Sequence, residues 1–208
     1  MFLPFPVVQE KNHELVALAQ LSGETAGVAL LDGDTVHYVD QVETPNPVRV
    51  RDWTGTRAPL WAVPSGLVLM AGMAAPALER ILALPLERLT ERTVVEPVAI
   101  RARLKTIARD GHAWGREEYV EGITSVAAAV ADGRGELVGA LHIHGPSYRF
   151  PPPGAEDEIA AALTAAAARV SGRLRTGARK GGSGSTGPGS RARAVAGPAS
   201  RGPVSRQA

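Results

Sequence analysis

The sequence of 208 residues contains no cysteine. This absence excludes a disulfide framework, a thiolate metal site and a cysteine nucleophile. No uninterrupted apolar stretch is long enough to cross a bilayer. The apolar start, Met1–Val8, is broken by prolines and has neither a basic n-region nor a small-residue cleavage site, so we expect no secretory signal. The expectation is a cytoplasmic protein with no membrane partner.

Motifs of several enzyme classes are also missing. There is no phosphate loop and no dinucleotide fingerprint. Ser125 lacks the Gly-x-Ser-x-Gly elbow of hydrolases. Glu117 and Glu118 are adjacent, and adjacent residues on a strand point to opposite faces, so they cannot flank one bond as an acid–base pair must. We therefore expect no enzyme and no cofactor.

Acidic residues are absent from the end of the chain, Thr176–Ala208, which is rich in glycine, proline and serine. Its six cations are Arg179, Lys180, Arg191, Arg193, Arg201 and Arg206. Taking these six charges from the net charge of +2 leaves −4 for the remainder, which argues against a phosphate-gripping domain. We predict one folded domain over 1–175 and a disordered tail over 176–208. A weak polyanion-binding arm is the alternative interpretation of that tail.

Hydrophobic periodicity and turn residues predict the first half of the fold. An amphipathic helix is predicted over Val8–Leu21. A hairpin follows, with Thr25–Leu31 and Thr35–Val42 joined at Asp32-Gly33-Asp34. A third short strand is predicted at Val48–Asp52, and Trp53–Pro59 is predicted to be a loop.

Helices dominate the next part of the prediction. They are expected over Pro64–Met73 and Pro76–Leu84, and from Pro97 to Gly111. A second hairpin pairs Ser125–Ala131 with Glu136–His144, and an acidic first turn at Glu156 opens the last helix. This order of elements indicates an α+β fold with a mostly antiparallel sheet.

Four segments follow one another with a characteristic order and spacing. They are Leu21-Ser-Gly-Glu-Thr25, Gly55-Thr-Arg-Ala-Pro-Leu-Trp-Ala-Val-Pro-Ser-Gly66, Gly111-His-Ala-Trp-Gly-Arg-Glu-Glu118 and Leu141-His-Ile-His-Gly-Pro146. Together they resemble the effector-binding domain of IclR-type bacterial transcription regulators, whose corresponding last segment is often Leu-Ser-Ile-Ser-Gly-Pro. The resemblance covers roughly Val8–Leu174.

The resemblance implies a GAF-like or profilin-like fold, a curved antiparallel sheet flanked by helices with a pocket on its concave side. It also implies a homodimer or homotetramer that binds a small carboxylate or aromatic acid. That effector would change how a separate N-terminal winged helix-turn-helix domain holds operator DNA. Met1 falls just before the effector domain, so we expect this chain to be without the DNA-binding domain, through a misplaced start codon or as a stand-alone sensor.

Six residues are candidates for effector binding. His142 and His144 lie two apart on a predicted strand, so both project from one face, and partly exposed structural histidines are the alternative. Ser65 and Gly66 begin an apolar helix whose free N–H groups suit a carboxylate, although a simple cap is compatible with the same pattern. Ser125, predicted on a strand beside His142, could add a hydroxyl to the pocket. The alternative is a small side chain that only fills space among the neighbouring alanines. Gly115 stands where some relatives carry an acidic pocket residue.

Other polar residues have weaker claims. Arg57 could reach an effector carboxylate, but a structural ion pair or an interface role is favoured. A metal shared by the two histidines would need further ligands, such as His112 or Glu118, and Gly115 removes one carboxylate, so we expect no metal site.

The leading hypothesis is thus the sensing domain of an IclR-type regulator. The alternative is a stand-alone effector-binding protein that acts by pairing with full-length relatives. The sequence leaves open the identity of the effector and the sign of regulation.

Overall fold

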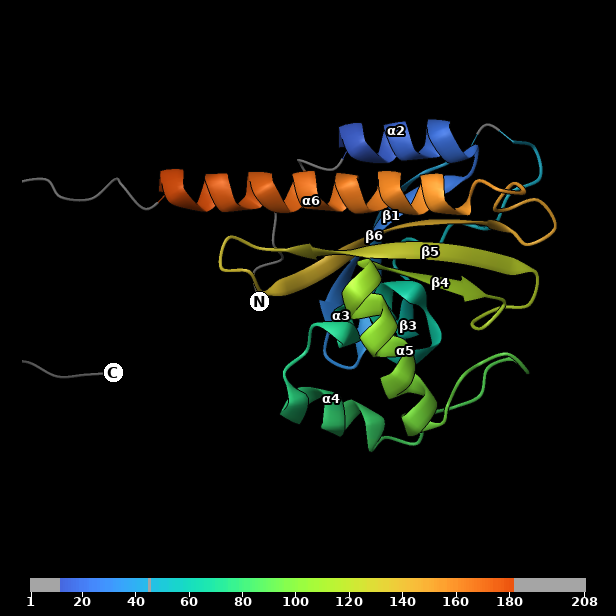
Figure 1. The fold of residues 1–208 in the computed structure, drawn as a ribbon. Helices are drawn as coiled ribbons and strands as arrows, with labels where there is room; N and C mark the ends of the chain where they lie inside the picture. Colours follow the sequence, from blue (N-terminus) through green and yellow to red (C-terminus); the bar gives the residue numbers. More distant parts are fainter. Residues whose placement is uncertain (1–11, 45, 182–208) are drawn as a thin grey trace, which may run out of the picture.

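The computed structural model describes residues 12–44 and 46–181. Within them a curved six-stranded antiparallel sheet lies between two groups of helices (Figure 1). In spatial order its strands are β3 (Arg57–Pro59), β2 (Thr35–Val42), β1 (Thr25–Asp32), β6 (Leu137–Pro146), β5 (Ile123–Ala131) and β4 (His112–Arg116). The helices are α2 (Asn12–Ser22), the 3-10 helix η1 (Leu60–Ala62), α3 (Pro64–Ala71), α4 (Ala75–Leu82), α5 (Pro97–Asp110) and α6 (Glu156–Gly181). The α+β fold expected from the sequence is confirmed.

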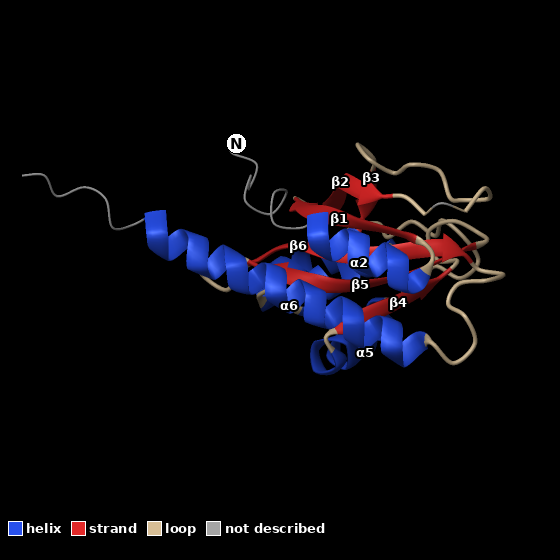
Figure 2. Ribbon diagram, turned by 90° about the horizontal axis from the view of Figure 1, so that it is seen from above, coloured by secondary structure: helices blue, strands red, loops and turns tan. Residues whose placement is uncertain are grey.

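Helices α2 and α6 cover one face of the sheet (Figure 2). Their apolar stripes, which include Leu15 and Leu163, are fully buried against β1, β5 and β6. Glu14 of α2 is also buried, and it accepts hydrogen bonds from Arg169 and Arg173 of α6. These charge-assisted bonds fix the two helices relative to each other. The predicted segment Val8–Lys11 lies outside the described residues.

The opposite face is covered by η1, α3, α4 and α5. Helix α3 is buried from Pro64 to Met70, as its almost wholly apolar sequence requires. The apolar stripe of α5, with Ile100 and Leu104, packs in the same core, and α5 ends where Gly111 adopts a left-handed conformation. Two cores therefore sandwich the sheet, and its central strands are buried on both faces.

Both predicted hairpins are confirmed. Asp32 pairs with Thr35 at the first turn, and the amide of Asp132 donates to the carbonyl of Glu136, 2.9 Å away, at the second. The connecting turns carry the Asp-Gly sequences that tight turns favour.

The predicted strand at Val48–Asp52 is wrong, and so is part of the predicted loop over Trp53–Pro59. The strand here is β3, Arg57–Pro59, which pairs with the start of β2. Ala58 is fully buried in this ladder, whereas the alternating arginines of 48–52 have no buried face to pack. Pairing with an existing sheet edge, rather than local pattern, decides which segment forms the strand.

Two further boundaries differ from expectation. Strand β4 ends at Arg116, so Glu117 and Glu118 are not on a strand, and Glu117 has a left-handed φ of 61°. Helix α6 continues to Gly181, so the predicted domain boundary at 175 falls inside it. The remainder of the predicted tail, 182–208, lies outside the described residues. None of the helices within residues 12–44 and 46–181 is both long and apolar enough to cross a membrane.

Candidate functional site

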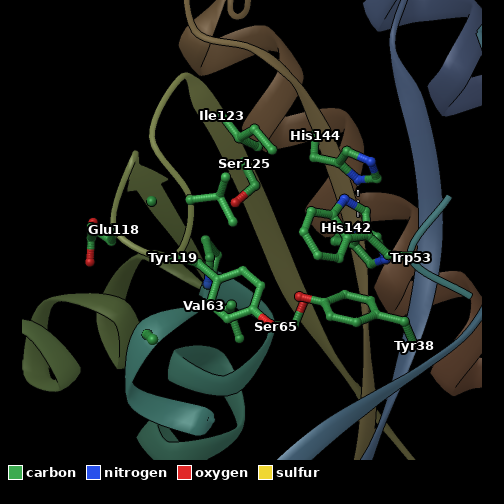
Figure 3. Close-up of a pocket in the computed structure, with 14 residues that line it drawn as sticks. Tyr38, Trp53, Val63, Ser65, Glu118, Tyr119, Ile123, Ser125, His142 and His144 are labelled. Carbon is green, nitrogen blue, oxygen red and sulfur yellow. Dashed lines mark hydrogen bonds between the residues drawn. The ribbon is translucent and has the colours of Figure 1, made fainter. Parts of the chain in front are cut away.

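A cavity that opens to solvent lies between the sheet and the first turn of α3 (Figure 3). Side chains of β2, β4, β5 and β6 form one wall, and the segment 118–123 together with Trp53 forms the other. The lining residues are Tyr38, Trp53, Ala62, Val63, Pro64, Ser65, Gly115, Glu118, Tyr119, Val120, Ile123, Ser125, His142 and His144. Most of this wall is apolar, with a few polar groups, which is typical of small-molecule sites.

Strand alternation places the two histidines of β6. Leu141 and Ile143 point into the core beneath α2 and α6, while His142 and His144 line the cavity on the other face. This confirms the orientation predicted from sequence. Both histidines are almost wholly buried, with 3% and 4% of their surfaces exposed.

The two imidazoles are in direct contact. Their Nδ1 atoms lie 3.4 Å apart, and their ring planes differ by only 19°. The ring centroids are 5.4 Å apart, farther than the two Nδ1 atoms. The edges that carry these nitrogens therefore face each other (Figure 3). The Nε2 atom of each ring is buried and has no hydrogen-bond partner. Unpartnered polar atoms at a cavity wall are costly, and they are what a polar ligand would satisfy.

Burial lowers the pKa of both histidines, because an imidazolium would lose its hydration. The pKa of His144 falls to about 4, although the carboxylate of Asp52 opposes the shift. The pKa of His142 lies well below its usual value, chiefly through burial and secondarily through its neighbour His144. Both rings are therefore neutral at neutral pH.

These pKa values predict that stability falls on acidification. The unfolded chain takes up protons on these histidines below pH ~6.5, whereas in the folded protein the pKa of His144 is about 4 and that of His142 also lies well below its usual value. The free energy of unfolding should therefore decrease by roughly 1.4 kcal/mol per histidine for each pH unit between those limits. Urea denaturation at about pH 7 and about pH 5.5 measures the difference.

His144→Asn should reduce that pH dependence, because it removes one of the two titrating rings. His13→Asn, on the exposed side of α2, is the matched control and should leave the dependence unchanged. Equal pH dependence in the His144→Asn variant and the unmodified chain would contradict the assignment.

Three other predicted residues lie around the same cavity. Ser65 occupies the first turn of α3, and Gly115 pairs with Ser125 across β4 and β5. A methyl group on Gly115 would lie 2.7 Å from the ring of Pro64, so this glycine lets α3 approach the sheet closely. Positive partial charge at the start of α3, which has no side-chain cap, faces the cavity.

Gly66 does not line the cavity. Its Cα packs against η1, where an added Cβ would lie 2.2 Å from the carbonyl oxygen of Leu60. Its amide donates to the carbonyl of Val63, 3.0 Å away. The structure therefore places Gly66 in helix packing, one residue beyond the cavity wall.

Two aromatic residues that sequence reasoning missed complete the site. Tyr38 packs edge-on against His142 with centroids 5.0 Å apart, and its hydroxyl points toward Ser65. Burial raises the pKa of Tyr38, against the opposing effect of a hydrogen bond with Ser65, so the phenol stays protonated. Trp53 is held beneath the guanidinium of Arg51, 4.3 Å from the ring centroid. The position of Tyr38 on an alternating strand was the available signal for that residue.

The charged candidates are engaged elsewhere. Glu118, at the cavity edge, forms an ion pair with Arg103, which also donates to the carbonyl of Trp114. Glu117 faces Arg92 at 3.8 Å, so the two glutamates do not act on a common centre. Arg57 pairs with Asp32 at 2.9 Å, as the structural alternative predicted.

The potential metal ligands are not gathered together. A ring nitrogen of His112 lies 3.1 Å from the carbonyl of Asp110, and Glu118 is bound by Arg103. Within the described part of the chain, no three acidic or histidine side chains are placed to share a metal ion.

Comparison with known proteins gives a consistent result. A family profile described as the C-terminal region of the bacterial transcriptional regulator IclR matches residues 5–172. The chain is 36% identical over 164 residues to the HTH-type transcriptional regulator Rv1719 of Mycobacterium tuberculosis, covering 79% of this chain and 62% of that relative. It thus spans less than two thirds of that relative. Thermotoga maritima IclR superposes with a TM-score of 0.76 at 25% identity, over 81% of this chain and 68% of the other.

Two further solved structures contain ligands. An IclR homologue from Microbacterium hydrocarbonoxydans, complexed with 4-hydroxybenzoate, has a TM-score of 0.74 at 24% identity and covers 84% of this chain and 70% of its own. A double mutant of the PobR inducer-binding domain from Acinetobacter, complexed with 3-hydroxybenzoic acid, has a TM-score of 0.72 at 21% identity. The match covers 82% of this chain and 98% of the other. At these identities the likeness is one of fold.

Proposed function

This chain belongs to the IclR family of bacterial transcriptional regulators, and on that premise we propose that its folded part senses a small aromatic carboxylic acid. The cavity between α3 and the sheet is the proposed effector site. The observation that carries the proposal is the pair of buried histidines whose outer nitrogens have no partner at a largely apolar cavity wall.

The shape and chemistry of the cavity fit this class of effector. Val63, Pro64 and Ile123, with the rings of Tyr119 and Trp53, offer apolar surface to an aromatic ring. The hydroxyls of Ser65 and Ser125 and the two imidazoles offer hydrogen bonds to a carboxyl or hydroxyl group. The hydroxybenzoates bound by two proteins of the same fold support an aromatic acid.

The regulatory role follows from the family. We propose that operator binding in the whole protein belongs to a winged helix-turn-helix domain separate from residues 12–181, and that the protein assembles as a homodimer or homotetramer. Effector binding would act by favouring one arrangement of these parts over another, since a ligand shifts an equilibrium only by its difference in affinity for the two states.

Isothermal titration calorimetry with 4-hydroxybenzoate tests the site. Because each variant removes one hydrogen-bonding group from the cavity, Ser65→Ala and His142→Ala should each weaken binding by about five- to tenfold. His112→Ala, at the start of β4 and outside the cavity lining, is the control and should bind as the unmodified chain does. Unchanged affinity in both cavity variants would place the effector elsewhere.

A further inference from the structure

No cationic side chain lines the cavity among the described residues, and the nearby Arg51 lies over the ring of Trp53. The only carboxylate among these lining residues, Glu118, is already neutralised by Arg103. A carboxylate that entered would therefore lose hydration without touching a cationic side chain of the cavity wall, which is unfavourable.

The contact between the histidines fixes how their protons are distributed. A hydrogen bond between two neutral rings across this 3.4 Å contact requires one Nδ1 to donate to the other, which makes the two rings opposite tautomers. The donating ring then has a bare Nε2 that can only accept, and its partner has an Nε2–H that can only donate. The pair as a whole thus has one vacant position for a proton, at the Nε2 of the donating ring.

A third unpartnered nitrogen lies on the same face of the sheet. Strand register aligns Gln41 of β2, Gly27 of β1 and His142 of β6 in one row. The side-chain nitrogen of Gln41 is buried without a partner, and it can only donate. The imidazole of His142 lies over Gly27, where an added Cβ would be 2.6 Å from Nε2, so the lack of a side chain at Gly27 makes room for this ring. Once the histidine pair carries an extra proton, both Nε2 atoms and the side-chain nitrogen of Gln41 are hydrogen-bond donors on this face of the sheet.

We propose that a carboxylate effector enters this cavity together with one proton, which the His142–His144 pair takes up. The proton comes from solvent and adds to the vacant Nε2, and no bond is broken. The Nδ1–H···Nδ1 hydrogen bond is kept, both Nε2 atoms become donors, and the pair gains a single positive charge that balances the carboxylate. This inference rests on the proposed function and specifies the form in which the effector binds.

The groups around the pair allow this change. Tyr38 of β2 and Tyr119 stay protonated, because burial raises the pKa of each. Ser65 and Ser125 do not titrate, and β1 presents Gly27. Asp52 favours a charge on His144, while the charge of Glu118 is balanced by Arg103. The histidine pair is the one unit here whose charge can change near neutral pH.

Calorimetry of the full chain with 4-hydroxybenzoate measures the proton directly. At about pH 6, titrations in phosphate and in bis-Tris, whose ionisation enthalpies differ, should report uptake of about one proton for each effector bound. Because the carboxyl of the probe ionises near pH ~4, affinity should weaken by about tenfold from about pH 5.5 to about pH 6.5. His144→Asn should abolish the uptake, and His13→Asn should preserve it.

Binding without proton uptake would overturn this inference and leave the proposed function standing. Failure of both 4-hydroxybenzoate and 3-hydroxybenzoate to bind at millimolar concentration would overturn both. Nitrogen-15 NMR of the histidine side chains in the unliganded chain provides a test that needs no variant. It should show one Nδ1–H and one Nε2–H tautomer at neutral pH, and two rings of the same tautomer would overturn the inference.

Discussion

Gly66→Ala is expected to lower the free energy of unfolding by about 3 kcal/mol and the melting temperature by roughly 6–12 °C. The added Cβ would lie 2.2 Å from the carbonyl oxygen and 2.4 Å from the Cα of Leu60. These are backbone atoms of η1 and cannot rotate away, so α3 would have to move off the buried turn against which it packs. Urea denaturation followed by circular dichroism measures the loss.

Gly172→Ala is the matched control, since both glycines lie within helices. The nearest atom to a Cβ at Gly172 is 3.8 Å away, which is an ordinary contact. Alanine there should raise the free energy of unfolding by up to ~1 kcal/mol, because it reduces the freedom of the unfolded chain. A change of the same sign in both variants would contradict the packing argument for Gly66.

Ser125→Leu should weaken 4-hydroxybenzoate binding by at least about tenfold. Ser125 lines the cavity from β5, and leucine would place an isobutyl group in the space proposed for the effector. The variant should remain folded, because the cavity is open at its mouth and can accept the added carbons. Calorimetry together with a thermal melt separates loss of binding from loss of fold.

Ser125→Ala distinguishes volume from hydrogen bonding at the same position. It removes only the hydroxyl, so its affinity should fall by no more than about fivefold. If Ser125→Leu bound the probe as well as Ser125→Ala does, the cavity would not be the effector site.

Local patterns predicted the parts of the fold whose partners are close in sequence. The turn at Asp32-Gly33-Asp34 specified the first hairpin, and alternation along β6 specified which way His142 and His144 point. The acidic first turn likewise identified the start of the last helix at Glu156.

Elements defined by distant partners were not predictable in this way. Strand β3 exists because Ala58 is buried against β2, and β4 because His112–Arg116 pairs with β5. The role of Gly66 depends on the backbone of Leu60, a contact that no periodicity reports. Tyr38 and Trp53 join the site only when the sheet curves around α3, so their contribution required the structure.

The site gains a specific character from its two histidines. A serine hydroxyl at either position would have no charge to gain near neutral pH. The pKa values of the buried imidazole pair are lowered chiefly by burial, and a carboxylate beside the pair would raise them, as the proposal requires. The domain should therefore respond to the pH as well as to the concentration of its effector.

The central claim is that the cavity beneath α3 holds the effector, and a crystal structure of the chain grown with 4-hydroxybenzoate tests it most directly. The account predicts the ring of the ligand between Val63, Ile123 and Trp53, with its carboxylate within hydrogen-bond distance of His142 or His144. Density for the ligand at any other surface, with this cavity unchanged and vacant, would contradict the account.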